Sequence, residues 1–190
     1  MNKNMPEEKK YEKQNIKAII GLGNTGPAYY KTRHSIGFRV IDELARTLNA
    51  SWSTSGDQQV AQAKLSLDPY DQKAPSVHLV KSLGFMNNSG HVLSYLLKKG
   101  IKPENILVIH DELEKKFGKT NIRFGGGARG HNGLRSIMGV IGGDFWRLSF
   151  GIDRPAEKSD VGNYVLRTFT PEEERALDTL ITQAVTLILN

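Results

Sequence analysis

The 190-residue sequence contains no cysteine, which excludes disulfide bonds and thiolate metal sites. Any metal site would therefore need histidine and carboxylate ligands. No apolar run approaches the roughly 18 residues that a membrane span requires, and residues 1–15 lack the apolar core of a signal peptide. We therefore predict a cytoplasmic protein without a membrane partner, and a disordered arm over residues 1–15.

Acidic residues are the smaller charged group, with 20 Asp and Glu against 26 Lys and Arg. The excess is uneven, because the segment from Tyr95 to Arg135 holds nine basic and four acidic residues. A basic stripe of this kind suits a polyanion, since neutralised phosphates release their counterions. A solvated charged face is the alternative that charge alone leaves open.

Apolar strands alternate with amphipathic helices along the chain. Strands are predicted over residues 16–21, 60–67, 76–81, 105–110, 118–124 and 147–152, and helices over 37–49, 91–100, 134–141 and 170–189. We expect Ser35 to cap the first helix and Thr170, with Pro171 and Glu173, to start the last one. A hairpin joins the second and third strands, and residues 153–163 form a polar loop. The pattern predicts a single α/β domain over residues 16–190, with a mostly parallel, mixed twisted sheet flanked by helices.

A glycine fingerprint follows the first predicted strand. Gly21, Gly23 and Gly26 have the G-x-G-x-x-G spacing of a dinucleotide-binding turn. Pro27 follows at once, however, and no acidic residue stands at the end of a second strand to hold a ribose. The sequence therefore disfavours an NAD-dependent oxidoreductase, which stays as an alternative.

No serine lies in a G-x-S-x-G elbow, so the chain offers no obvious side-chain nucleophile. The loops expected at the strand ends instead carry histidine, aspartate and asparagine. His34 is suited to act as a general base near neutral pH, and Asp111 is suited to fix its tautomer. Asn87 and Asn132 can donate to an oxyanion. These residue types predict activation of water.

Each of these residues also has a structural interpretation. His34 precedes a helix, where a histidine is often structural, and Asp111 can be a turn residue. Asn24 and Asn132 can serve a turn and a helix N-cap. The run 125–130, GGGARG, can be a flexible loop, since it lacks the Lys-Ser/Thr ending of a phosphate-binding P-loop. A metal site near Asp111 and His131 is disfavoured, because adjacent strand residues point to opposite faces.

Four motifs occur in order between about Ile16 and about Thr170: G-L-G-N-x-G with T-R-H, F-M-N-x-S-G, H-D-E-L, and G-G-G-x-x-G-H-N-G-L-R-S. In these motifs the chain resembles bacterial-type peptidyl-tRNA hydrolases. The resemblance implies hydrolysis of the ester between a peptide and the 3′ ribose of tRNA, without a metal or cofactor. It implies His34 as the catalytic base, Asp111 as its support and Asn24 beside them. It also implies substrate contacts for Tyr29, Met86, Asn87, Arg123, His131 and Asn132.

The chain departs from the family pattern at several points. Ser35 stands where asparagine is frequent, and Ser149 stands where a second phosphate-binding cation is frequent beside Arg123. We expect Arg147, on the same strand face as Ser149, to substitute for that cation. The sequence ends at Asn190 inside the closing helix, whereas relatives usually continue. Both a natural and a truncated C-terminus therefore stay as alternatives. We predict a monomer that binds peptidyl-tRNA, with a non-catalytic RNA-binding relative as the second alternative.

Overall fold

Seven strands form one sheet in the order β2-β3-β4-β1-β5-β7-β6, within residues 9–68 and 70–190 described by the computed structural model. The neighbouring strands β4, β1, β5 and β7 are parallel, whereas β2, β3 and β6 pair antiparallel at the two sides. The strands are β1 Ala18–Gly21, β2 Ser53–Ser55, β3 Gln58–Lys64, β4 Ser76–Ser82, β5 Ile106–Glu112, β6 Thr120–Phe124 and β7 Trp146–Gly151. This arrangement confirms the predicted mixed α/β fold.

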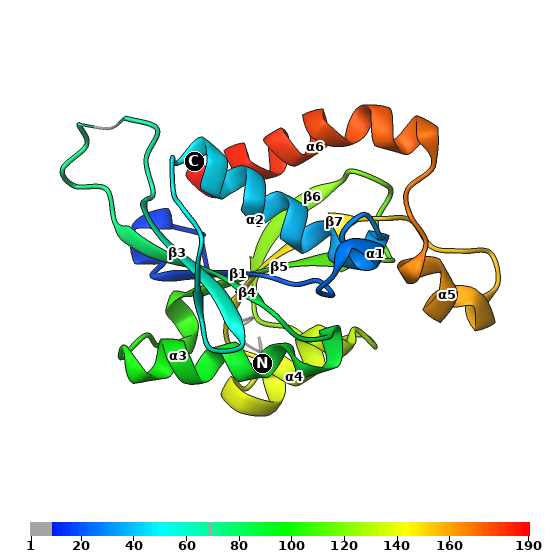
Figure 1. Ribbon diagram of the computed structural model, residues 1–190, viewed down its shortest axis with the longest axis horizontal. Coiled ribbons are helices and arrows are strands. Elements are labelled where there is room, and N and C mark those ends of the chain that lie inside the picture. Colours follow the sequence, from blue (N-terminus) through cyan, green and yellow to red (C-terminus); the bar gives the residue numbers. More distant parts are fainter. Residues whose placement is uncertain (1–8, 69) are drawn as a thin grey trace, which may run out of the picture.

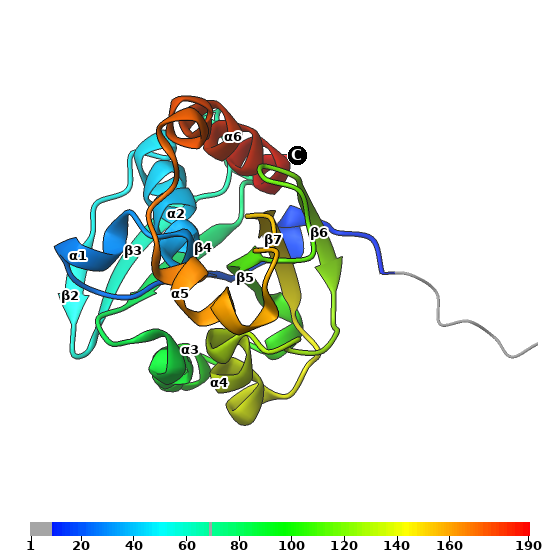
Figure 2. The same cartoon turned by 90° about the vertical axis from the view of Figure 1, so that its right-hand side faces the viewer.

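Helices cover both faces of the sheet. Helices α2 and α6 lie on one face and α3 and α4 on the other, in both views (Figures 1 and 2). Each pair covers its own cluster of buried side chains, so the sheet separates two cores. The helices are α1 Pro27–Tyr30, α2 Ile36–Thr47, α3 Leu93–Lys98, α4 Asn132–Ile141, α5 Val161–Leu166 and α6 Pro171–Leu189. None of the described helices is long and apolar enough to cross a bilayer.

The predicted hairpin is confirmed, since β3 and β4 pair antiparallel with Val60 opposite Val80. The first strand of the hairpin, β3, begins and ends earlier than predicted. Its predicted end is replaced by a turn, in which the backbone N–H of Asp68 donates to the hydroxyl of Ser66. Strand β2 was not predicted, since its three residues are polar and exposed. The polar loop predicted over residues 153–163 contains the start of α5, whose Val165 is buried.

The closing helix confirms its predicted start. Thr170 accepts the backbone N–H of Glu173, and the Glu173 carboxylate accepts the backbone N–H of Thr170. Ser35, in contrast, makes no capping bond to α2. Its hydroxyl instead accepts the backbone N–H of Asn24 at 3.1 Å, because the 3₁₀ turn Arg33–Ser35 continues directly into α2.

The described part of the N-terminal segment, residues 9–15, differs from the disordered arm that the sequence predicts. Tyr11 packs edge-on against Trp146, with ring centroids 5.4 Å apart, and its hydroxyl donates to the carbonyl of Ile188 at 3.1 Å. An aromatic side chain that reaches the core offsets the entropy of ordering the segment. The rest of the predicted arm, residues 1–8, lies outside the described residues.

Glycines let α2 lie close to the ends of β1 and β5. A Cβ on Gly21 would lie 2.6 Å from the carbonyl oxygen of Gly37, and a Cβ on Gly23 would lie 2.6 Å from the ring of Phe38. A Cβ on Gly37 would lie 2.5 Å from the carbonyl oxygen of Leu22. The glycine spacing therefore serves helix–strand packing, and this close packing places the start of α2 beside the end of β5.

Candidate active site

The site lies at the carboxyl edge of the parallel strands, where their loops converge. Asn24 follows β1, Met86 follows β4, and Asp111 lies near the end of β5. Asp111 and Glu112, expected beyond the end of the predicted strand 105–110, belong to β5 itself, because the strand stays paired with β7 up to Glu112. Asp111 is therefore held by a sheet ladder on a rigid strand.

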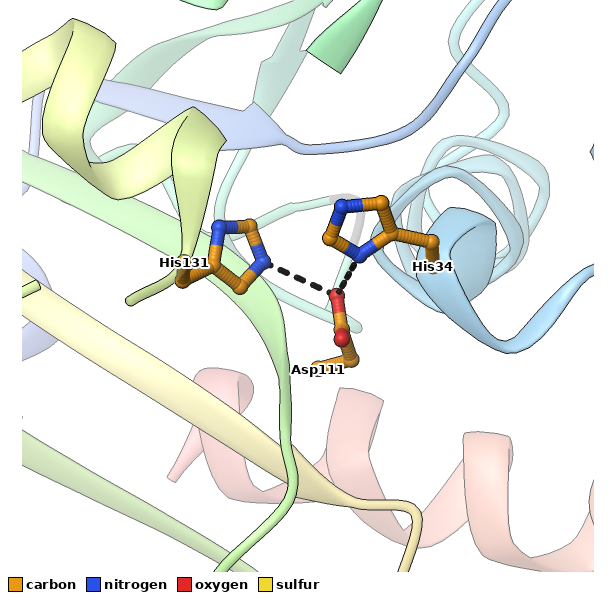
Figure 3. Close-up of side chains that lie close together, drawn as sticks. All are labelled: His34, Asp111 and His131. Atoms are coloured by element: carbon orange, nitrogen blue, oxygen red, sulfur yellow. Dashed lines mark hydrogen bonds and ion pairs between the residues drawn. The ribbon is translucent and has the colours of Figure 1, made fainter. Parts of the chain in front are cut away.

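Two histidines share one oxygen of Asp111. Nδ1 of His34 and Nε2 of His131 each lie 2.9 Å from Oδ1 of Asp111 (Figure 3). His34 comes from the turn before α2, and His131 from the residue before α4. Because an ionised carboxylate only accepts hydrogen bonds, both rings donate to it. Nε2 of His34 therefore keeps its lone pair, as a general base requires.

The electrostatics favour this role. Burial lowers the pKa of the His34 imidazole, but the charge of Asp111 and the hydrogen bond to it outweigh burial and raise that pKa above its ordinary value. Burial raises the pKa of Asp111, but His34 and His131 together hold it well below its ordinary value. Asp111 is therefore ionised at neutral pH and stabilises a proton on His34.

The ligand atoms of His34, Asp111 and His131 lie within 4.8 Å of one another, as a metal site would require. Nδ1 of His34 and Nε2 of His131 nevertheless each direct their N–H group at the same oxygen of Asp111. A metal ion would have to displace both protons and break both bonds. The prediction of no metal stays a prediction.

A pocket of about 400 Å³ opens beside this cluster. It brings together five of the residues singled out from the sequence: His34, Asp111, Arg123, His131 and Asn132. Apolar side chains from the turn after β5 and from α4 and α5, such as Leu113, Leu134 and Val165, complete its wall together with the loop 127–130. A mixed wall of cations, amides and apolar groups suits a ligand with both charged and apolar parts.

Asn24, Tyr29, Met86 and Asn87 do not line this pocket. The buried amide of Asn24 accepts the backbone N–H of Met86 at 2.6 Å, which ties the loop after β1 to the loop after β4. Met86 is buried, whereas Asn87 is exposed. Tyr29 packs edge-on against Phe85 with ring centroids 5.8 Å apart. These residues form a second group, which reaches His34 through the bond from Asn24 to Ser35.

His131 has two roles that the sequence did not predict. Besides its bond to Asp111, its Nδ1 accepts the backbone N–H of Leu134 at 3.2 Å, so His131 is the N-cap of α4. The alternative that Asn132 serves as the N-cap is therefore wrong. Asn132 is exposed in the first turn of α4, and its amide oxygen accepts a bond from Arg135 at 3.2 Å.

His110 is a further residue of the pocket wall that sequence reasoning left aside. It is buried, and its Nδ1 donates to the backbone carbonyl of Asp111 at 2.7 Å. Burial, with His131 nearby, lowers the pKa of His110 to about 3. The ring is therefore neutral and holds the peptide unit of Asp111 in place. Its position in the H-D-E-L motif was the signal available in the sequence.

Arg147 does not replace the cation expected at Ser149, and that expectation is wrong. Its guanidinium is buried and donates to the carbonyls of Gly126 and, at 2.7 Å, of Gly127. The hydroxyl of Ser149 instead accepts a bond from Nζ of Lys115 at 2.7 Å. Lys115, which sequence reasoning counted only in the basic stripe, is thus the cation beside Ser149.

A histidine paired with a buried carboxylate, in a pocket whose described lining holds no serine, threonine or cysteine, is typical of the class of hydrolases that use water as the nucleophile. Residues 18–189 match the family model described as peptidyl-tRNA hydrolase, and the chain belongs to that family.

Individual relatives agree with the family match. A peptidyl-tRNA hydrolase of Aquifex aeolicus is 39% identical over 177 residues, covering 92% of this chain and 88% of the relative. One from Aliarcobacter butzleri is 40% identical, covering 90% and 88%. The crystal structure of peptidyl-tRNA hydrolase from Acinetobacter baumannii superimposes with a TM-score of 0.84 at 32% identity, covering 94% of this chain and 89% of that one. The resemblance seen in the four motifs is thus confirmed.

Proposed function

We propose that the protein hydrolyses the peptide–tRNA ester with a water molecule activated by His34. One observation carries the proposal: Nδ1 of His34 lies 2.9 Å from Oδ1 of Asp111, which leaves Nε2 free as a base. The family supplies the reaction, the release of peptide and tRNA from peptidyl-tRNA.

The steps follow from that geometry. Nε2 of His34 takes a proton from water as the water oxygen bonds to the ester carbonyl carbon. Collapse of the tetrahedral intermediate breaks the bond to the ribose 3′ oxygen, which takes the proton back from His34. The products are a free 3′ hydroxyl and a peptide carboxylic acid, which releases the remaining proton of the water to solvent and becomes a carboxylate. Asp111 stays ionised throughout and stabilises the transient imidazolium.

The remaining residues place the substrate. Asn132 lines the same pocket as His34 and supplies an amide for the ester, and exposed Asn87 is available to the peptide. Asn24 fixes the loop after β1 against the loop after β4 and, in this proposal, helps to place the water. Arg123 binds a phosphate of the tRNA, while Tyr29, Met86 and His131 shape the surrounding surface. In this proposal the enzyme acts as a cytoplasmic monomer and uses neither metal nor cofactor.

The two alternatives are less well supported. A non-catalytic RNA-binding relative would have no need for the pairing of His34 with Asp111. A nicotinamide enzyme would need a free glycine turn, whereas Gly21 and Gly23 are occupied by contacts with α2.

The test uses N-acetyl-aminoacyl-tRNA as substrate. The unmodified protein should release N-acetyl-amino acid, and His34→Ala should lose about 10²–10⁴ of that rate, as expected for a general base. His91→Ala is the matched control, because His91 is a half-buried histidine in the turn Met86–Val92 and lines none of the pocket. No release by the unmodified protein, or equal release by His34→Ala, would contradict the proposal.

The amides also predict selectivity. Asparagine amides that pair with a peptide N–H and C=O would be left unpaired by an aminoacyl-tRNA, which lacks the acylated nitrogen. Cleavage of aminoacyl-tRNA should therefore be much slower than cleavage of its N-acetyl form. Equal rates would show that these amides do not recognise the peptide.

A further inference from the structure

Arg33 immediately precedes the base His34 and has no part in the reaction steps described above. The residue is 5% exposed, so its guanidinium is withdrawn from water. One guanidinium nitrogen donates to a carboxylate oxygen of Glu173 at 2.6 Å, and another donates to the backbone carbonyl of Thr168. A buried arginine that lost these partners would be left as an unpaired charge, so the contacts hold the side chain in one position.

The contacts of Arg33 lie along the chain that connects α5 to the first turn of α6. The guanidinium carbon lies 4.5 Å from the ring centroid of Tyr164 and 5.1 Å from that of Phe169, distances at which a ring attracts a cation. The backbone N–H of Arg33 donates to the carbonyl of Arg167 at 3.0 Å. The connection passes the start of α2 (Figure 2). The turn that carries His34 is therefore bonded to it through both backbone and side chain.

The connection has anchors of its own. The hydroxyl of Tyr164 donates to the backbone carbonyl of Ile152 at 2.6 Å, just beyond the end of β7. Val165 is buried in the core, and the capping box fixes the start of α6. The connection is thus a frame with its own attachment to the sheet, and Arg33 fastens the short turn Arg33–Ser35 to that frame.

We propose that Arg33 is a positioning residue of the hydrolase, which holds the turn of His34 so that the ring meets Asp111 and its Nε2 faces the pocket. The role rests on the proposed function, because it concerns the base of that reaction. Arg33 is not among the residues that line the pocket, so it acts through His34. A displacement of about 1 Å in a catalytic group can cost about 10²-fold in rate, which makes the attachment of a short turn important.

A second ion pair provides a matched control. Arg39 donates to both carboxylate oxygens of Glu174, at 2.8 and 3.1 Å, and so joins α2 to the first turn of α6. The pair of Arg33 with Glu173 joins the turn before α2 to the same turn of α6. Arg39 does not line the pocket that holds His34. The two pairs therefore differ in whether the arginine is next to the base.

The first experiment compares Arg33→Met with Arg39→Met in the hydrolysis of N-acetyl-aminoacyl-tRNA, well below the unfolding temperature of either variant. Methionine fills the space beside the rings but donates no hydrogen bond. Arg33→Met should lower kcat about 10- to 100-fold and change KM much less, because the base is displaced. Arg39→Met should lower the unfolding temperature and keep kcat. An unchanged kcat in Arg33→Met, or an equal loss in both variants, would overturn the positioning role.

The second experiment tests the partner of Arg33. Glu173→Gln can keep the capping box but removes the charge that holds Arg33, so kcat should fall, though less than in Arg33→Met. The double variant should match Arg33→Met, since two residues that act as a unit are not additive. Multiplied losses would show that Arg33 does not act through Glu173, and Glu174→Gln is the control that should keep kcat. If Arg33→Met does not fold, Arg33→Lys takes its place, because lysine keeps the charge without the planar fork, and Arg39→Lys becomes its control.

Proton NMR gives a readout that does not require activity. The Nδ1–H of His34 that donates to Asp111 should give a slowly exchanging signal, assigned by its loss in His34→Ala. The signal should disappear in Arg33→Met and persist in Arg39→Met. A signal that persists in Arg33→Met would show that the turn stays in place and would remove the positioning role alone. Absence of hydrolysis by the unmodified protein would remove the proposed function and leave this measurement intact.

Discussion

His34 and Asp111 are joined by a 2.9 Å hydrogen bond although they lie 77 residues apart in the sequence. The bond joins the start of α2 to the end of β5, and close packing at Gly37 brings these elements together. Its chemical effect is to direct the second nitrogen of His34 away from the carboxylate. The geometry of a proton acceptor is therefore set by how a helix packs on a sheet.

The pH profile should report this pair. Since the pKa of His34 is raised and the base must be unprotonated, kcat/KM should fall as pH drops through a value above about 6.5. Asp111→Asn removes the charge that raises the pKa but leaves the burial that lowers it. The acid limb should therefore move to lower pH, and kcat should fall about 10²–10⁴. Steady-state kinetics across the pH range measure both, and an unmoved acid limb would argue against the coupling.

Two substitutions of His131 should separate the effects of its hydrogen bonds to Asp111 and to the backbone N–H of Leu134. In His131→Asn the amide sits near the Nδ1 position and can still cap α4, but the donor to Asp111 is lost. In His131→Gln the amide nitrogen reaches the Nε2 position, and the cap is lost. We expect His131→Asn to lose activity with little change in stability, and His131→Gln to lose about 1 kcal/mol of stability with more activity kept. Thermal unfolding and kcat measure the two effects, and the reverse pattern would show that the cap is what matters.

The sequence predicts the elements whose signal is local. The continuous apolar run of β5 and the Thr170–Glu173 capping box each identify their element without tertiary information. Strand β2 and helix α5 were missed for the opposite reason. Ser53–Ser55 is an exposed edge strand that pairs with β3, and among the described residues of α5 one side chain, that of Val165, is buried.

The same distinction applies to the site. His34 and Asp111 were predicted because their chemistry and motif context are visible along the chain. The bond from His131 to Asp111 depends on where α4 begins relative to β5, which no local pattern encodes. The burial of Arg147 under a glycine loop likewise depends on tertiary packing, so the expectation that it replaces the phosphate-binding cation at position 149 was wrong.

Salt dependence should report the proposed phosphate contact of Arg123. Arg123→Ala should flatten the log–log dependence of tRNA affinity on salt by about 0.7 to 0.9, the contribution of one phosphate contact. Arg46→Ala should leave the slope unchanged, because Arg46 pairs with Glu43 on α2 and does not line the pocket. Filter binding across a salt series measures the slopes, and equal slopes for the two variants would mean that Arg123 does not contact RNA.

The glycine spacing after β1 makes a prediction about stability. Gly21→Ala would place a Cβ 2.6 Å from the Gly37 carbonyl, and the resulting shift of α2 should cost about 1–3 kcal/mol. Gly139→Ala is the matched control, since Gly139 lies within α4 with nothing within 4 Å of an added Cβ, and helix propensity should make it stabilising by about 0.5–1 kcal/mol. Urea unfolding compares the two. A neutral Gly21→Ala would mean that α2 can move away from β1 at little cost, and then Gly21 would not be what fixes His34 beside Asp111.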